Sequence, residues 1–216
     1  MTTPTEHQLT PPGGWRLAEA VRIPPLDVHR ASPMKRLLVA VVNRLGHLDA
    51  SNLFLTLMQN TRLFRRWLRF ASTLMPYGEI DRVDTERVIL RVAWNCRSRY
   101  EWGQHVDIGM RAGLTAKDIE QVVCGGDAEG LSTRVAALLR ACDEFHQERM
   151  ISAPTWQALA AHYERRHLLE VVMLMGHYEM LAGVLNSTGI SLDPALERVL
   201  AEAPIHERIA GAAVRG

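Results

Sequence analysis

The chain has 216 residues, of which 47% are hydrophobic, and this is enough for one compact domain with a substantial core. Twenty-five Lys and Arg are interspersed with 24 Asp and Glu, and the formal net charge of +1 excludes a long basic track for nucleic acid. The three cysteines are far apart and lack CxxC spacing, which argues against a disulfide framework and a structural zinc site.

The start of the chain has no apolar core of signal-peptide type, and no stretch contains the roughly 18 uncharged apolar residues of a membrane span. We therefore expect a soluble protein of the reducing cytoplasm. Nucleic acid and membrane are not expected as partners, and no metal ion is expected either.

Residues 1–33 differ in composition from the rest. They hold six of the ten prolines, namely Pro4, Pro11, Pro12, Pro24, Pro25 and Pro33, beside Gly13 and Gly14. Because proline removes a backbone donor and fixes φ, this segment is predicted to be an extended arm. It either wraps a neighbour or its own body, or forms a partly ordered tail. Residues 34–216 are predicted to form a single all-α domain.

From Met34 onward the apolar residues recur at helical spacing. Asn60 is a candidate N-cap, Thr115 and Asp118 form a candidate capping pair, and Gly46 is a candidate C-cap. No alternating strand pattern with hairpin turns is present. The sequence predicts an all-α bundle of about eight to ten helices, with segments 34–46, 60–75, 84–96, 98–114, 115–123, 132–150, 152–163, 167–186 and 193–203.

The stretch SRYEWGQHVDIGMRAGL, residues 98–114, places Ser98, Glu101 and His105 at offsets of three and four. On a helix these side chains share one face. The same letters can be a capping box, in which Ser98 caps the helix and Glu101 returns the hydrogen bond. We favour the cap for Ser98 and leave Glu101 open between the two roles.

His105 is the candidate catalytic base, since an imidazole both takes and gives a proton near neutral pH. Glu101 can orient it, and Glu86 on the preceding helix can add a second carboxylate. The predicted catalytic residues are His105, Glu101 and Glu86, and this acid–base chemistry requires no cofactor. The predicted substrate-binding residues are Ser98, Tyr100, Trp102, Arg91 and His177. Four of them have a structural alternative: a helix cap for Ser98, an interface or surface role for Tyr100, a core or pocket wall for Trp102 and a satisfied core histidine for His177.

Glu86, the run ILRVAWNC, then Tyr100, Glu101, Trp102, Gln104 and His105, followed by AGLTAKDIEQV, resemble the core motif of the carboxymuconolactone decarboxylase superfamily, which includes the alkyl hydroperoxidase D proteins. The resemblance covers about residues 62–123. It implies a multi-helix bundle of the alkyl hydroperoxidase D type that assembles as a dimer, trimer or hexamer.

In the peroxidase branch of this superfamily, a glutamate precedes a CxxC pair and a histidine follows it. Glu86 and His105 match that glutamate and histidine, whereas Ser98 and Glu101 stand where the two cysteines would be. A disulfide cycle needs two thiols within reach of each other. The resemblance, with this departure, favours acid–base chemistry over redox chemistry.

We therefore predict a cofactor-independent lyase of the decarboxylase type, acting on a small organic acid or lactone as a homo-oligomer. One alternative is a peroxidase-like oxidoreductase in which Cys96 replaces the lost pair. The other is a non-catalytic helical protein that serves binding or assembly.

Overall fold

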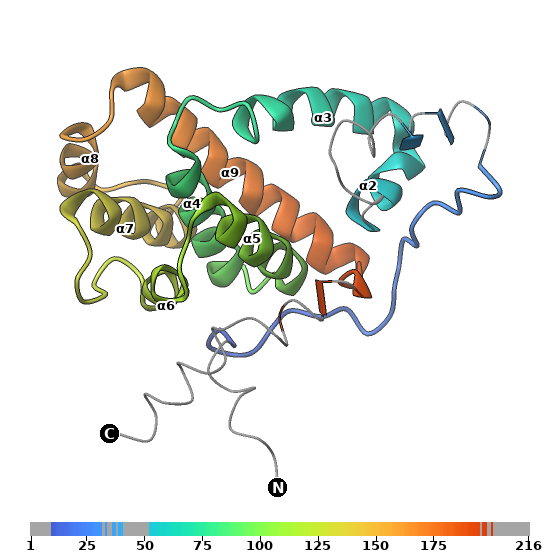
Figure 1. Cartoon of the computed structure of the whole chain (residues 1–216), viewed down its shortest axis with the longest axis horizontal. Helices are drawn as coiled ribbons and strands as arrows, with labels where there is room; N and C mark the ends of the chain where they lie inside the picture. Colours follow the sequence, from blue (N-terminus) through green and yellow to red (C-terminus); the bar gives the residue numbers. More distant parts are fainter. Residues whose placement is uncertain are drawn as a thin grey trace, which may run out of the picture.

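The structure is a computed structural model, and it describes residues 10–31 and 52–194 together with single positions between 33 and 40 and between 196 and 200. The described part is helical and contains no strand, so the predicted all-α fold is confirmed (Figure 1). Gly46 and most of the segments 34–46 and 193–203 lie outside the described residues.

The helices follow one another with short connections. In chain order they are α2 (Asn52–Leu57), the 3-10 turn η1 (Met58–Asn60), α3 (Thr61–Leu74), α4 (Arg82–Asn95), α5 (Arg99–Ala112), α6 (Ala116–Cys124), α7 (Thr133–Glu148), α8 (Ala153–Ala160) and α9 (Arg165–Thr188).

Two of the predicted caps are present. The Asn60 side chain accepts a hydrogen bond from the backbone N–H of Leu63 at the start of α3. Thr115 and Asp118 form a reciprocal capping box at the start of α6. These side chains satisfy backbone donors that have no partner within the helix, and they fix where each helix begins.

Helix α4 lies at the centre of the fold and packs against α5, α6, α7 and α9 (Figure 1). Nine of its residues are buried, including Val88, Ile89 and Leu90. A helix that is apolar on several sides is stable only when neighbours cover each side. Glu86 lies among these buried residues of α4, so its carboxyl group is in the interior.

The N-terminal segment runs along the outside of this bundle and hydrogen-bonds to it (Figure 1). The backbone N–H of Arg16 donates to the carbonyl of Arg97 at 2.9 Å, and that of Arg22 donates to the carbonyl of Thr188 at 2.8 Å. Residues 10–31 contain turns and bends and no helix. Of the two expectations for this segment, these contacts favour an arm that wraps its own chain.

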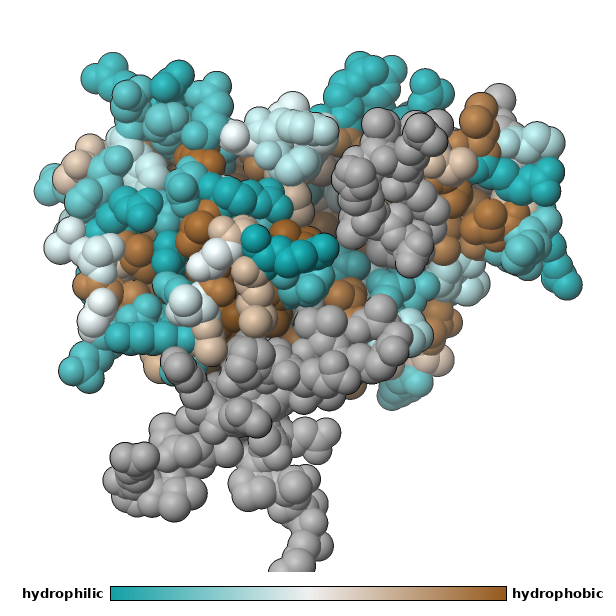
Figure 2. All heavy atoms as spheres, viewed as in Figure 1, coloured by the Kyte–Doolittle hydropathy of each residue, from teal (hydrophilic) through white to brown (hydrophobic). Residues whose placement is uncertain are grey.

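The far end of the molecule is formed by η1, the start of α3 and the arm. Met58 and Phe64 are buried there, with Leu26 and Val28 of the arm packed against them. Figure 2 shows hydrophobic residues exposed around this end, on the right of the view. The apolar cover that the arm supplies here stabilises its docking on the bundle.

Helix α9 is long and apolar enough to cross a membrane by length and composition alone, and half of its most apolar window is buried. It carries Leu174, Met175, Leu181 and Leu185 into the main core. The buried side of α9 therefore packs as part of the core of the bundle.

Candidate active site

Glu86 and His105 form a buried pair between α4 and α5. A carboxylate oxygen of Glu86, Oε2, lies 2.7 Å from Nδ1 of His105. An ionised carboxylate can only accept, so with Glu86 in that form Nδ1 donates to it and Nε2 is the acceptor nitrogen of the ring. Glu86 is fully buried, whereas 7% of the His105 side chain remains exposed. The imidazole is thus the accessible half of the pair.

Arg82 lies one turn before Glu86 on α4. Its Nη2 is 2.8 Å from the second Glu86 oxygen, an ion-pair distance without hydrogen-bond geometry. Its guanidinium thus lies against the carboxyl group that orients His105. Arg82, Glu86 and His105 therefore form a chain of polar contacts that leads from the partly exposed Arg82 to the site.

The start of α5 differs from the prediction. Ser98 is the N-cap residue by position, but its hydroxyl makes no capping hydrogen bond, so the predicted capping box is wrong. The Ser98 hydroxyl and both Glu101 carboxylate oxygens are buried with no partner among the described residues. The body of the protein covers the first turn of α5, and Ser98, Tyr100 and Glu101 are all buried.

Burial raises the pKa of Glu101 well above its usual range. Burial therefore favours the protonated form of this carboxyl, which can donate a proton. Buried polar atoms without partners are uncommon in proteins and require a physical explanation. Their position here, on the same helix as His105 and one turn before it, is what a site that awaits a polar ligand would show.

Tyr178 of α9 closes this group from the other side. Its ring meets the His105 ring edge-on, with 5.2 Å between centroids. Burial, and then the charge of Glu86, raise the pKa of Tyr178 well above its usual value. Its hydroxyl therefore stays protonated.

Arg91, a predicted substrate clamp, is engaged elsewhere. Its Nε donates to Asp143 at 2.6 Å, and its Nη1 donates to the carbonyls of Val122 and Val123, both at 2.8 Å. These bonds connect α4 to α6 and α7. The geometry gives Arg91 a structural role between helices.

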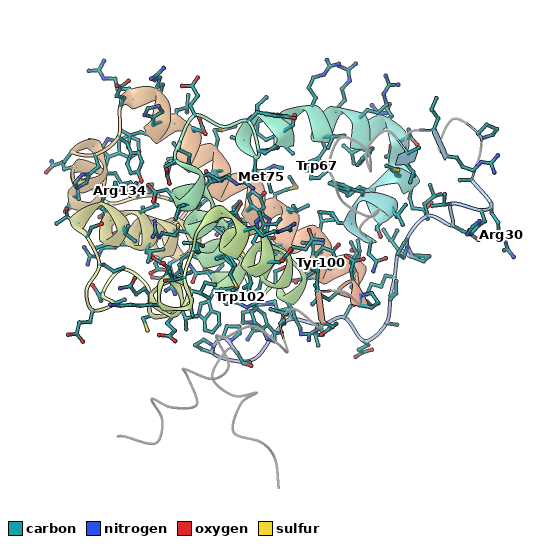
Figure 3. All side chains as sticks on the ribbon, in the orientation of Figure 1. Arg30, Trp67, Met75, Tyr100, Trp102 and Arg134 are labelled. Atoms are coloured by element: carbon teal, nitrogen blue, oxygen red, sulfur yellow. The ribbon has the colours of Figure 1, made fainter. Side chains whose placement is uncertain are left out.

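Tyr100 and Trp102 also have structural contacts. The Tyr100 hydroxyl donates to Asp193 at 2.8 Å and accepts from the Leu53 backbone N–H at 3.1 Å. Trp102 packs beside Trp94, with 5.2 Å between centroids, and Trp15 of the arm covers it at 6.0 Å. Figure 3 shows Trp102 on the side of α5 that faces the arm.

His177 lies one residue before Tyr178, and the two rings meet edge-on with 5.2 Å between centroids. The His177 ring stacks on Trp67 of α3 at 6.0 Å between centroids, and Phe70 meets it edge-on at 5.4 Å. Figure 3 shows Trp67 on α3. Burial lowers the pKa of His177 to about 4, so the ring is neutral at physiological pH.

This pKa predicts a pH dependence of stability. In the unfolded chain His177 titrates near its ordinary pKa of 6.5, so between pH 6.5 and 4 the unfolded state binds more protons. The free energy of unfolding should fall as pH is lowered through this window, by up to about 3 kcal/mol. Urea denaturation of His177→Phe should lack this part of the slope. The exposed His162→Phe should keep it, and an unchanged slope in His177→Phe would contradict the prediction.

A cavity of about 380 Å³ lies where the arm, the start of α5 and the end of α9 meet. Tyr100 is the one predicted site residue that lines it, and Glu86, Glu101 and His105 do not. Its other charged lining residues, Arg16, Glu19, Arg99 and Glu197, have mixed sign. The buried acid–base group and this cavity are therefore separate features.

The structure brings Glu86, Glu101 and His105 to one region and leaves Arg91, Trp102 and His177 in packing roles. Two further residues, Arg82 and Tyr178, were not among the predicted site residues. Arg82 precedes Glu86 by four positions, a helical ion-pair spacing that the sequence displays. Tyr178 comes from a helix more than 70 positions away from His105, and only the packing of α9 brings it close.

Comparisons with known proteins agree with this fold. Residues 61–144 match the sequence model of the carboxymuconolactone decarboxylase family. No curated protein shows significant similarity to the chain.

Three solved structures illustrate the likeness. A peroxidase-related protein with an alkylhydroperoxidase AhpD core from Ralstonia eutropha JMP134 is 16% identical, with a TM-score of 0.71 over 83% of this chain and 96% of that one. A peroxidase-related protein from Silicibacter sp. TM1040 is 13% identical, with the same score and coverage. A variant of the debrominase Bmp8, in complex with 2,3,4-tribromopyrrole, is 14% identical, with a TM-score of 0.68 over 86% of this chain and 98% of that one. At these identities the likeness shows the alkyl hydroperoxidase D-like fold.

Proposed function

We propose that this chain is a cofactor-independent enzyme that moves protons on a small organic acid or lactone. The proposal starts from the match of residues 61–144 to the sequence model of the carboxymuconolactone decarboxylase family. Family and fold support an enzyme or a peroxidase-related role at the level of the family. The observation that carries the finer proposal is the Glu86–His105 hydrogen bond of 2.7 Å.

The reaction follows from the positions of the protons. Glu86 holds the Nδ1 proton of His105, so Nε2 accepts a proton from a carbon next to a substrate carbonyl. The resulting enolate oxygen needs a donor, and Glu101 and Ser98 each offer a buried hydroxyl without another partner. Return of the proton from Nε2 to another carbon gives isomerisation. In a decarboxylation, Nε2 first takes the proton of the substrate's carboxylic acid, loss of carbon dioxide leaves the enolate, and Nε2 returns that proton to carbon.

The peroxidase-like alternative depends on Cys96, and its surroundings oppose it. Burial raises the pKa of the Cys96 thiol to about 12. Thiolate is the form that attacks a peroxide, and at neutral pH this thiol is protonated. The non-catalytic alternative does not account for the unpartnered polar atoms at the start of α5.

Proton exchange at carbon tests the proposal directly. The full chain is incubated in D₂O with carboxymuconolactone and with a set of small carboxylic acids and lactones, and deuterium uptake and carbon dioxide release are followed by NMR. We expect at least one compound to react faster than without protein. A parallel assay measures consumption of hydrogen peroxide with dithiothreitol as reductant. Peroxide consumption without exchange at any carbon would support the peroxidase-like alternative instead.

Glu101→Gln should stabilise the protein and impair the reaction. Because the pKa of Glu101 is higher in the folded chain than in the unfolded chain, the folded chain keeps a proton that the unfolded chain has released. The free energy of unfolding therefore falls as pH rises above the unfolded pKa. A glutamine side chain does not titrate, so the Glu101→Gln variant lacks this loss. The melting temperature of the variant should exceed that of the wild type by more at pH 8 than at pH 4. The exposed Glu129→Gln is the control and should show no such gap. An equal melting temperature at both pH values would contradict a neutral, buried Glu101.

Homo-oligomerisation, a small-molecule substrate and a cytoplasmic location stay predictions. Light scattering on the purified chain would give the number of subunits. A dimer, trimer or hexamer is the expected result.

A further inference from the structure

The second group of chemically capable side chains lies at the other end of α4. Cys96 is the residue that ends α4, His146 lies in the last turn of α7, and Glu179 lies on α9. The Cys96 Sγ is 3.8 Å from Nδ1 of His146, and Oε1 of Glu179 is 2.7 Å from the same nitrogen. The sulfur, nitrogen and oxygen atoms all lie within 4.8 Å of one another.

This geometry does not fit a catalytic triad. A relay needs the thiol at one ring nitrogen and the carboxylate at the other, so that the ring passes a proton between them. Here both Cys96 and Glu179 face Nδ1 of His146, and the two compete for one nitrogen. Three ligand atoms that converge on one point are instead the arrangement around a metal ion.

The ligand types and spacing fit Zn²⁺ or a similar borderline divalent ion. Zinc binds sulfur at about 2.3 Å and imidazole nitrogen or carboxylate oxygen at about 2.0–2.2 Å in tetrahedral geometry. Ligand atoms in such a site lie roughly 3.3–3.8 Å apart. The sulfur–nitrogen distance of 3.8 Å already lies at the edge of this range, and the nitrogen–oxygen distance of 2.7 Å must lengthen by a few tenths of an ångström.

The surroundings of Cys96, His146 and Glu179 contain features that favour a bound cation and one feature that opposes it. Cys96 and His146 lie at the C-terminal ends of α4 and α7, where the helix dipoles favour a positive charge. Arg149 opposes this, because its guanidinium pairs with the second oxygen of Glu179. The Arg149 side chain is 64% exposed, so it can turn to solvent and leave the carboxylate to an ion.

We propose that Cys96, His146 and Glu179 bind one divalent ion of the zinc class and leave a fourth position open. The ion would connect the ends of α4 and α7 to the middle of α9. Metal binding displaces the proton of the Cys96 thiol, so the apparent affinity for the ion should rise with pH.

Cobalt is the probe for this site, because a cobalt–thiolate bond gives a charge-transfer band in the near ultraviolet. The full chain, without a histidine tag, is stripped with a chelator, desalted and titrated with Co²⁺ and then with Zn²⁺. We expect one Co²⁺ per chain with this band and its loss when Zn²⁺ is added. Absence of the band, or of stoichiometric binding, would overturn the proposal.

Variants assign the ligands. Cys96→Ser should abolish the band and weaken Zn²⁺ binding by at least roughly tenfold, since removal of even an outer-shell partner costs about that much. The exposed Cys124→Ser is the matched control and should bind as the wild type does. A band that survives in Cys96→Ser, or that is lost equally in Cys124→Ser, would contradict the assignment. If Cys96→Ser does not fold by circular dichroism, His146→Gln, at a partly exposed position, replaces it.

Arg149 gives a test of opposite sign. Arg149→Asn removes the competing charge, and asparagine tolerates the left-handed backbone of this position, where φ is 59°. Zn²⁺ should bind this variant several-fold more tightly than it binds the wild type. Weaker or equal binding would exclude Glu179 as a ligand.

Discussion

His105→Gln should lower the turnover rate by about 10²–10⁴-fold on any compound that the wild-type chain converts in the exchange assay. The glutamine keeps a polar side chain of similar size beside Glu86 but cannot accept and return a proton. Steady-state kinetics should show the loss in kcat, because a proton-transfer residue acts in the transition state. His162→Gln, at an exposed histidine, is the control and should leave kcat unchanged.

Glu86→Gln separates orientation from proton transfer. The amide can still accept the hydrogen bond from Nδ1 of His105, but the charge that supports a protonated imidazole is lost. The rate should therefore fall less than in His105→Gln, and the acidic limb of the pH–rate profile should move to lower pH. A His105→Gln variant with wild-type kcat, or a Glu86→Gln variant with an unshifted profile, would remove these residues from the mechanism.

Asp84→Ala should lower the free energy of unfolding by about 3 kcal/mol, the lower end for a broken buried ion pair. Asp84 is fully buried two residues before Glu86 and accepts from Arg87 at 3.0 Å and from the Tyr163 hydroxyl at 2.7 Å. It also pairs with Arg134 of α7, labelled in Figure 3. We expect the lower end of the range for a broken buried ion pair because the Arg134 side chain is 38% exposed. Water can therefore hydrate its guanidinium group when the Asp84 carboxylate is removed.

Urea denaturation with an unchanged m-value would measure this loss. Asp127→Ala is the matched control, since that carboxylate is 91% exposed in its pair with Arg140 and should contribute less than about 1 kcal/mol. Equal effects of the two variants would mean that the Asp84 contacts do not stabilise the start of α4. In that case another interaction would have to hold Glu86 in place.

Local sequence was enough to predict the helices from residue 60 to residue 186. Most of the predicted segments 34–46 and 193–203 lies outside the described residues. Helix α3 follows from the stripe of Leu63, Phe64 and Trp67 and from the Asn60 cap. The Thr115 capping box marks the start of α6 in the same way. Caps and periodicity are properties of neighbouring residues, so a single segment contains the information.

The capping box at Ser98 shows where this reasoning failed. The letters SRYE are those of a cap, but burial of the first turn of α5 leaves Ser98 and Glu101 without the bonds that a solvent-facing cap makes. Burial is a property of the packed bundle, and no local pattern reports it. The same burial gives Glu101 its raised pKa and makes it a candidate proton donor.

The sequence by itself determined which helices form and which residues have the chemistry for proton transfer, because both depend on residue type and short-range spacing. Only the tertiary structure decided which of these residues meet. Packing of α4, α5 and α9 joined Glu86 to His105 and brought Tyr178 beside them, while it committed Arg91 to helix contacts. It also brought together Cys96, His146 and Glu179, whose separations along the chain match no metal motif. Contacts between distant segments arise from burial of apolar faces, which short-range spacing does not specify.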